Sequence, residues 1–219
     1  VGFISSRSPR GRAPMLLQPL LLPFAYLPMG VPASRPAALA RLACAPFMQV
    51  AEVIEPPLME SSCGFDFVPL LTALQTGEWR EADQLTRDAL IKLAGSAAVA
   101  RGYVYFTEAP NLPEEDMATI ERLWRAYSGN KFGYSVQRDV FNSKKVGRNF
   151  EKLFERIGWK NPDGTLLRWL PEAKSDEFIY DVEKAVPGHL PLTSTLRGTQ
   201  LLQRLMDHKA WERDEFTSS

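Results

Sequence analysis

The chain has 219 residues, of which 45% are hydrophobic and 24% charged, a composition that suits a packed globular core and excludes a wholly disordered chain. Its formal net charge is zero, but residues 1–51 hold five basic residues and no acidic one, so all 26 acidic residues follow them. Its two cysteines, Cys44 and Cys63, exclude a disulfide framework and a cysteine-based zinc site. The uneven charge predicts a leader joined to a single domain.

The first part of the chain, residues 1–50, is rich in Ser, Arg, Pro and Ala and lacks acids, which is typical of an organelle-targeting leader. Its apolar run, Met15–Gly30, is too short to span a membrane and is interrupted by three prolines. A signal peptide ahead of a transit peptide, or a proline-rich tail without a targeting role, are the alternatives. Residues 51–64 are predicted to be a linker, and residues 65–215 the folded domain.

Helical spacing of apolar residues predicts most of the elements of this domain. We expect a short helix over Phe67–Leu74 and a longer one over Trp79–Leu93, each ended by a glycine. Residues 97–106 fit a helix or a strand equally well. After the central region, we expect a helix over Phe150–Ile157, and a strand or an irregular loop around Phe178, Tyr180 and Val182. A last helix is expected to carry Leu201, Leu202, Leu205 and Met206. Thr193 or Ser194 is expected to cap it.

The organising stretch of the chain is residues 119–141. Pro113 and the three acids after it predict a helix start. One apolar face follows, made of Met117, Ile120, Leu123, Trp124 and Tyr127. Residues 128–130 (Ser-Gly-Asn) then end the helix, and Ser135 is expected to cap the next one. Between the two helices lies FGYSVQ (132–137), whose large apolar side chains either fill the core or line a site for a flat apolar ligand.

The residue inventory argues against catalysis. The only histidines are His189 and His208, and no carboxylate-histidine cluster has metal-ligand spacing. Residues 133–137 resemble the start of a nucleophile elbow but carry Gln137 in place of the second glycine. There is no phosphate loop, dinucleotide fingerprint or nucleic-acid-binding motif. We therefore expect a binding protein without catalytic residues, metal site or catalytic cofactor.

Three motifs in order give the chain a family resemblance. LWRAYSGNKFGYSVQ (123–137), EWREADQLT (78–86) and PGHLPL (187–192) resemble the genomes-uncoupled-four family, the tetrapyrrole-binding activators of magnesium chelatase. The resemblance implies an all-α, cupped-hand domain that binds protoporphyrin IX or Mg-protoporphyrin IX. It also implies contact with the large, porphyrin-binding subunit of the chelatase, a role in chlorophyll biosynthesis, and a place in the chloroplast stroma or at plastid membranes. We expect a monomer.

The ligand surface is predicted to combine the two aromatic and proline-containing loops with a cation for the ring's propionates. The predicted tetrapyrrole-binding residues are Leu123, Phe132, Tyr134, Val136, His189, Leu190, Pro191, Leu192 and Arg197. Lys131 and Arg138 are further candidates for the propionates, whereas Trp124 is expected in the core. His189 is either an axial metal ligand or, more often for such a loop, a hydrogen-bonding residue that fixes the backbone.

The sequence departs from the family pattern at two places. Tyr134 stands where many members carry Phe, and Asn130-Lys131 stands where Gly-Arg is usual. These departures concern ligand choice more than fold, so a divergent member that binds another tetrapyrrole is one alternative. The other is a helical protein-interaction module without pigment.

Overall fold

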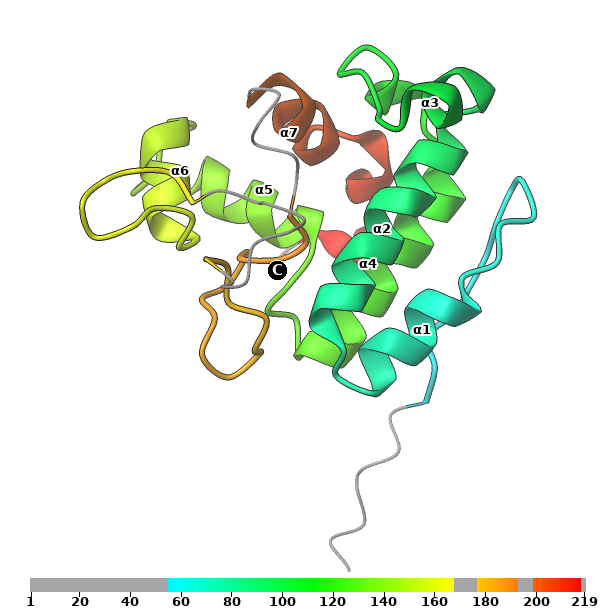
Figure 1. Cartoon of the computed structure of the whole chain (residues 1–219), viewed down its shortest axis with the longest axis horizontal. Helices are drawn as coiled ribbons and strands as arrows, with labels where there is room; N and C mark the ends of the chain where they lie inside the picture. The colour runs from blue at the N-terminus through cyan, green and yellow to red at the C-terminus, as the bar shows by residue number, and fades with distance from the viewer. Residues whose placement is uncertain (1–54, 168–176, 193–198, 218–219) are drawn as a thin grey trace, which may run out of the picture. The chain divides into compact units, whose positions relative to one another are not determined.

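The computed structural model describes residues 55–167, 177–192 and 199–217. The predicted leader, Arg197, and the predicted cap residues Thr193 and Ser194 lie outside these ranges. The helices, including short 3-10 helices (η), are α1 (Val68–Gln75), α2 (Trp79–Leu93), α3 (Ser96–Arg101), η1 (Ala109–Asn111), α4 (Glu114–Ser128), α5 (Tyr134–Asn142), α6 (Phe150–Arg156), α7 (Thr199–Met206), η3 (Lys209–Glu212) and η4 (Asp214–Phe216) (Figure 1).

The described residues form an all-α structure, as the sequence predicts. Their one β-type contact is an isolated bridge between Lys160 and Leu166. Residues 97–106, left open between helix and strand, form α3 and a loop. The segment around Phe178 and Tyr180 is an irregular loop. No described helix has the length and apolarity needed to cross a membrane.

α4 is the centre of the packing. It begins after Pro113 with three acids in its first turn, and it ends at Gly129, whose left-handed φ of 61° allows the backbone to turn away. Trp124 on α4 is fully buried and donates its indole N–H to Thr86 Oγ1 on α2 at 2.9 Å, which joins the two neighbouring helices. The position of Trp124 in the core confirms the prediction from the helical pattern.

The end of the predicted linker is fixed to α4. The hydroxyl of Ser61 donates to the buried carboxylate of Asp116 at 2.5 Å, and Ser62 donates to the same carboxylate through both its backbone N–H (3.1 Å) and its hydroxyl (2.8 Å). The backbone N–H of Glu60 donates to Thr119 Oγ1 at 2.9 Å. These bonds make residues 60–62 part of the folded unit, since their removal would leave Asp116 buried without its partners.

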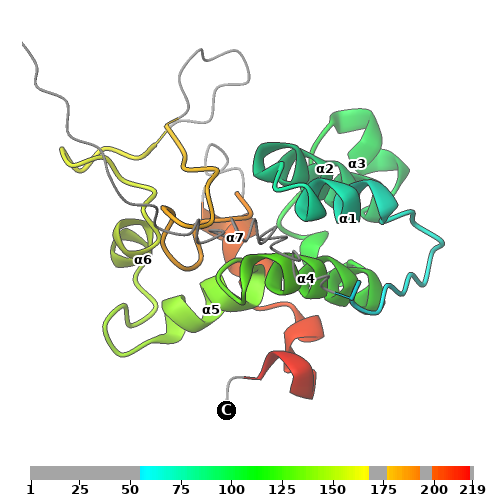
Figure 2. The same cartoon turned by 90° about the horizontal axis from the view of Figure 1, so that it is seen from below.

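The C-terminal 3-10 helices lie on the side of α4 and α5 opposite α1 and α2 (Figure 2). Arg138 of α5 donates to the carbonyl oxygens of Trp211 at 2.9 Å and Phe216 at 3.3 Å. Arg122 of α4 forms an ion pair with Glu215 at 3.0 Å. Arginines of α4 and α5 therefore hold the end of the described chain in place.

Candidate functional site

Two of the three family motifs form one structural unit, in which the FGYSVQ (132–137) and GHLPL (188–192) segments are joined by backbone hydrogen bonds. Gly133 N donates to Leu190 O at 3.0 Å, and Gly188 N donates to Lys131 O at 2.9 Å. The side-chain amide of Gln137 adds two bonds, to the carbonyl oxygens of Gly188 at 3.0 Å and Pro191 at 2.9 Å. The sequence-based expectation that these distant segments act together is therefore matched by direct contact, and we call the pair the motif unit.

The first turn of α5 is capped by a carboxylate from α4. Glu121 accepts the backbone N–H groups of Tyr134 at 2.8 Å and Ser135 at 3.0 Å, and the Ser135 hydroxyl at 2.5 Å. A Cβ at Gly133, whose φ is 143°, would overlap the carboxylate of Glu121, so only glycine fits there. Ser135 was predicted from the sequence to be the N-cap residue of this helix. This was wrong, because Ser135 lies inside the first turn and serves as a donor to Glu121.

Burial perturbs this carboxylate. Glu121 has no exposed surface, and loss of solvation raises its pKa from 4.5 to about 7, against the effect of the three donors and of Arg125. Arg125 itself donates to Asn130 Oδ1 at 3.0 Å. A carboxyl group with a pKa near neutrality thus sits directly under the FGYS turn.

A second buried carboxylate holds the other half of the motif unit. Asp83 of α2 accepts the backbone N–H of Leu192 at 2.7 Å and pairs with Arg87 at 2.6 Å. Burial raises the pKa of Asp83 from 3.8 to about 6, although Arg87 and the Leu192 N–H lower it. Glu121 and Asp83 therefore fix the two segments to α4 and α2, respectively.

Neither acid was predicted from the sequence to have a role in the site. A signal was present, because both lie inside apolar helical stripes: Asp83 between Ala82 and Thr86, and Glu121 next to Ile120 and one turn before Trp124. A charged residue within a buried stripe indicates a carboxylate with a specific internal partner.

Most of the predicted ring-contacting side chains lie in the core. Leu123, Phe132, Tyr134 and Leu190 have no exposed surface, and Leu192 is 4% exposed. Pro191 is also buried, and Val136 is half-buried. In this arrangement these residues offer almost no surface to a ligand, so direct contact between them and a tetrapyrrole stays a prediction that requires them to move.

Phe132 shows how the motif unit is packed. Its ring lies 5.5 Å from that of Trp79 in an edge-on contact and 6.2 Å from that of Trp124. Tyr134 stacks on Trp211 at 6.3 Å. Of the two interpretations left open for FGYSVQ, the structure places these aromatic side chains as core filling.

His189 fixes the GHLPL loop through both ring nitrogens. Its Nδ1 lies 2.7 Å from Ile157 O, and its Nε2 accepts the backbone N–H of Ile179 at 3.0 Å. Burial lowers the pKa of His189, which favours the neutral ring. This arrangement matches the loop-fixing role expected for it. Across the described ranges, no group of three or more His, Cys, Asp or Glu side chains is placed to hold a metal ion.

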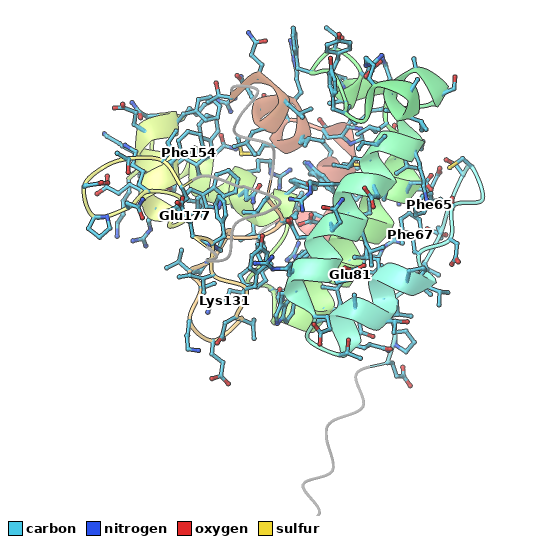
Figure 3. The ribbon with its side chains drawn as sticks, viewed as in Figure 1. Phe65, Phe67, Glu81, Lys131, Phe154 and Glu177 are labelled. Carbon is cyan, nitrogen blue, oxygen red and sulfur yellow. The ribbon has the colours of Figure 1, made fainter. Side chains whose placement is uncertain are left out.

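The candidate cations for the propionates are placed differently from one another. Lys131 lies beside the 177–192 segment (Figure 3), and its Nζ donates to the carbonyl oxygens of Val182 at 2.5 Å and Glu183 at 3.3 Å. Arg138 is engaged by the C-terminal carbonyl groups described above. Arg197 lies outside the described residues, so its role stays a prediction.

An exposed apolar surface lies on the segment from α3 to η1, and the sequence analysis did not recognise it. Val99 is 53% exposed, Tyr105 45% and Phe106 39%, and the ring of half-buried Tyr103 lies 5.2 Å from that of Tyr105. Arg101 lies 4.3 Å from the centre of the Tyr105 ring. We call the four apolar and aromatic residues 99, 103, 105 and 106 the α3–η1 surface.

The α3–η1 surface is held rigidly. Arg101 pairs with Glu108 at 2.6 Å, and Glu108 also accepts the backbone N–H of Tyr105 at 2.9 Å. η1 packs against α7, the helix that follows residues 193–198. Exposed aromatic groups held in place in this way are typical of a binding surface.

Comparison with known proteins gives this arrangement a context. Residues 60–209 match the GUN4-like family. The chloroplastic tetrapyrrole-binding protein of Arabidopsis thaliana is 42% identical over 135 residues, which cover 61% of this chain and 50% of the relative. A Ycf53-like protein of Synechocystis is 39% identical over 155 residues, covering 71% of this chain and 63% of the relative. The chain thus spans about half to just under two thirds of the length of these relatives.

Solved structures agree with this match. The structure of GUN4 from Chlamydomonas reinhardtii is similar with a TM-score of 0.62 and 43% identity, covering 71% of this chain and 95% of that one. The ligand-free structure of Arabidopsis thaliana GUN4 gives a TM-score of 0.58 and 38% identity, covering 70% of this chain and 99% of that one. Together with the matched residues 60–209, these similarities show that the chain belongs to the GUN4-like family.

Proposed function

We propose that this chain is a non-catalytic, tetrapyrrole-binding regulator. The observation that carries the proposal is the family match over residues 60–209, together with the 42% identity to an Arabidopsis protein named for tetrapyrrole binding. On this basis the ligands are protoporphyrin IX and Mg-protoporphyrin IX. The protein partner is the large subunit of magnesium chelatase, which the chain stimulates in the plastid stroma or at plastid membranes.

The α3–η1 surface is the docking area for the ring that the described residues support best. A porphyrin presents two broad apolar faces, so it needs apolar side chains that water can already reach, and Val99, Tyr105 and Phe106 meet this need. Burial of some 100–200 Å² of ring face at about 25 cal/mol per Å² contributes several kcal/mol before the costs of association. The motif unit then acts as a frame that positions α4 and α5.

Titration with protoporphyrin IX tests the function. The wild-type chain should shift the absorption spectrum of the pigment and lose part of the fluorescence of its five tryptophans. A protein-interaction module without pigment would show neither change. Stimulation of magnesium chelatase by added protein, measured as Mg-protoporphyrin formed, tests the regulatory role, and its absence would refute that role alone.

A matched pair of variants tests the docking area. Val99 on α3 and Val68 on α1 are exposed to nearly the same extent, 53% and 54%. Val99→Asp should weaken protoporphyrin binding about tenfold or more, since a carboxylate would be desolvated beneath the ring. Val68→Asp should leave the affinity unchanged. Equal affinities of the two variants would refute docking on the α3–η1 surface.

Arg197 is proposed as the partner of a propionate. Arg197→Ala should weaken protoporphyrin binding roughly five- to tenfold, because a partly exposed ion pair contributes about 1 kcal/mol. A porphyrin with esterified propionates should bind the wild type and the variant equally. The same loss of affinity for both pigments would exclude a direct contact between Arg197 and a propionate.

A further inference from the structure

The segment from the end of α5 to just beyond α6 concentrates basic side chains. Residues 143–160 contain six basic and two acidic residues, whereas the chain from Glu52 onward has 21 basic and 26 acidic ones. We call these six residues the α6 basic surface: Lys144, Lys145, Arg148, Lys152, Arg156 and Lys160. A basic segment within an otherwise acidic domain produces a local positive potential that attracts acidic partners.

Five of these six cations are exposed, and Lys160 is half-buried. Lys144, Lys145, Lys152 and Arg156 are exposed, and none of the four forms an ion pair with another described residue. Arg148 is the exception, since it contacts Asp207 at 3.4 Å while its side chain stays 51% exposed. Most of the positive charge is therefore not neutralised within the described part of the fold.

The connection that carries this charge has a fixed shape. Val146 is 3% exposed and anchors it in the core. Gly147 N donates to Ser143 O at 2.8 Å, and Arg148 N donates to Phe141 O at 2.9 Å. The Arg148 guanidinium also lies 5.2 Å from the centre of the Phe141 ring. Because the backbone that carries these side chains is already ordered, docking of a partner would cost conformational entropy mainly in the side chains.

The surroundings of these cations favour a protein over a membrane or a nucleic acid. None of the exposed large apolar side chains of the described residues lies between 143 and 160, so no exposed apolar or aromatic side chain there is available to insert into a bilayer or to stack on bases. Glu151 and Glu155, both exposed, alternate with Lys152 and Arg156 along α6. The two glutamates weaken the attraction of this segment to a uniformly anionic surface, whereas on a protein surface of patterned charge the alternating charges can set the register of the contact.

We propose that the α6 basic surface docks an acidic surface of a protein partner, through a contact separate from pigment binding. Side chains at the rim of such a contact mainly accelerate association, so binding should weaken as salt is raised. The proposed function enters only in the choice of the first probe, the large subunit of magnesium chelatase. A glutamate-rich peptide serves as a second probe that does not depend on that function.

The test compares two double charge reversals of the full chain. Lys145→Glu/Lys152→Glu changes the α6 basic surface, and Lys92→Glu/Lys184→Glu makes the same change of net charge at exposed lysines elsewhere. We expect the first variant to lose at least tenfold in affinity for both probes and most of the salt dependence, and the second to lose less than threefold. Both should melt close to the wild type, since the Lys184–Asp181 ion pair that the second variant loses is exposed to solvent, and both should bind protoporphyrin IX with unchanged affinity.

Each other outcome overturns the proposal or one part of it. Equal losses of affinity in the two variants would show that only the net charge of the chain matters, and not the α6 basic surface. Wild-type affinity for the peptide in the Lys145→Glu/Lys152→Glu variant would exclude the surface. Vesicles of phosphatidylglycerol that bind the wild type and not this variant, with protein binding intact, would assign the surface to a membrane. A subunit that binds no form of the chain would refute the proposed partner, and the peptide would then decide the surface.

Discussion

Replacement of Phe132 by alanine tests whether the frame of the fold is distinct from the proposed pigment-binding surface. The Phe132 side chain has no exposed surface and lies against Trp79 and Trp124, which are themselves held in the core. Two indoles anchored in helices cannot collapse into the space left behind, so the change should cost about 3–5 kcal/mol of folding free energy. For a domain of this size, that loss lowers the melting temperature by roughly 10 °C.

The assay pairs thermal melts with protoporphyrin titrations at a temperature where the variant is folded. If the α3–η1 surface holds the ring, Phe132→Ala should change the dissociation constant less than about threefold. Phe106→Ala, at a side chain 39% exposed, should show the opposite pattern, with a nearly unchanged melt and about tenfold weaker binding. A Phe132→Ala protein that has the melting temperature of the wild type but binds protoporphyrin much more weakly would contradict this prediction. It would indicate that FGYSVQ contacts the ligand.

Three further predictions concern the frame. Because burial raises the pKa of Glu121 from 4.5 to about 7, its stabilising contribution is complete below pH 4.5 and lost as the pH rises through 7. Glu121→Gln should remove a change on the order of 3 kcal/mol in the free energy of unfolding between pH 4.5 and 7. Thermal melts at several pH values measure this, and a variant whose stability depends on pH as the wild type does would contradict it. Gly133→Ala should lower stability by several kcal/mol, whereas Gly129→Ala, with open space around its Cβ position, should cost only about 1–2 kcal/mol in chemical denaturation. A chain that starts at Gly64 should have a much lower melting temperature than one that starts at Glu55, since buried Asp116 loses the hydroxyl donors of Ser61 and Ser62. Equal melting temperatures would show that residues 60–62 are a linker and not part of the folded unit.

Much of the helical framework is predictable from the sequence because burial imposes a period on it. The apolar stripes of α2 and α4 and the glycines after them gave helix limits within a residue or two of those observed. Segments without such a period were not resolved in advance. Residues 97–106 were left between helix and strand, and the packing of α3 on α2 favours the helix at residues 96–101.

The cap of α5 shows a different limit. Local sequence favours Ser135, since Ser is a common N-cap residue, but Glu121 from the preceding helix takes that function. Capping by a residue 13 positions upstream depends on how α4 packs, which no local pattern contains. The buried position of Glu121 was visible in the stripe, although its partner was not.

The difference between frame and surface explains why the family was easier to predict than the site. Within FGYSVQ, Gly133 is required by the nearby carboxylate, Ser135 donates to it, and Phe132 fills the space between two indoles. Each of these residues is determined by its internal neighbours, so the motif identifies the fold. Tyr105 and Phe106 are exposed, so only a binding partner would determine their identity. For this reason the sequence around them shows no pattern that reveals a site. A motif that is recognisable because it is buried marks the scaffold on which a ligand surface is built, and it need not contain that surface.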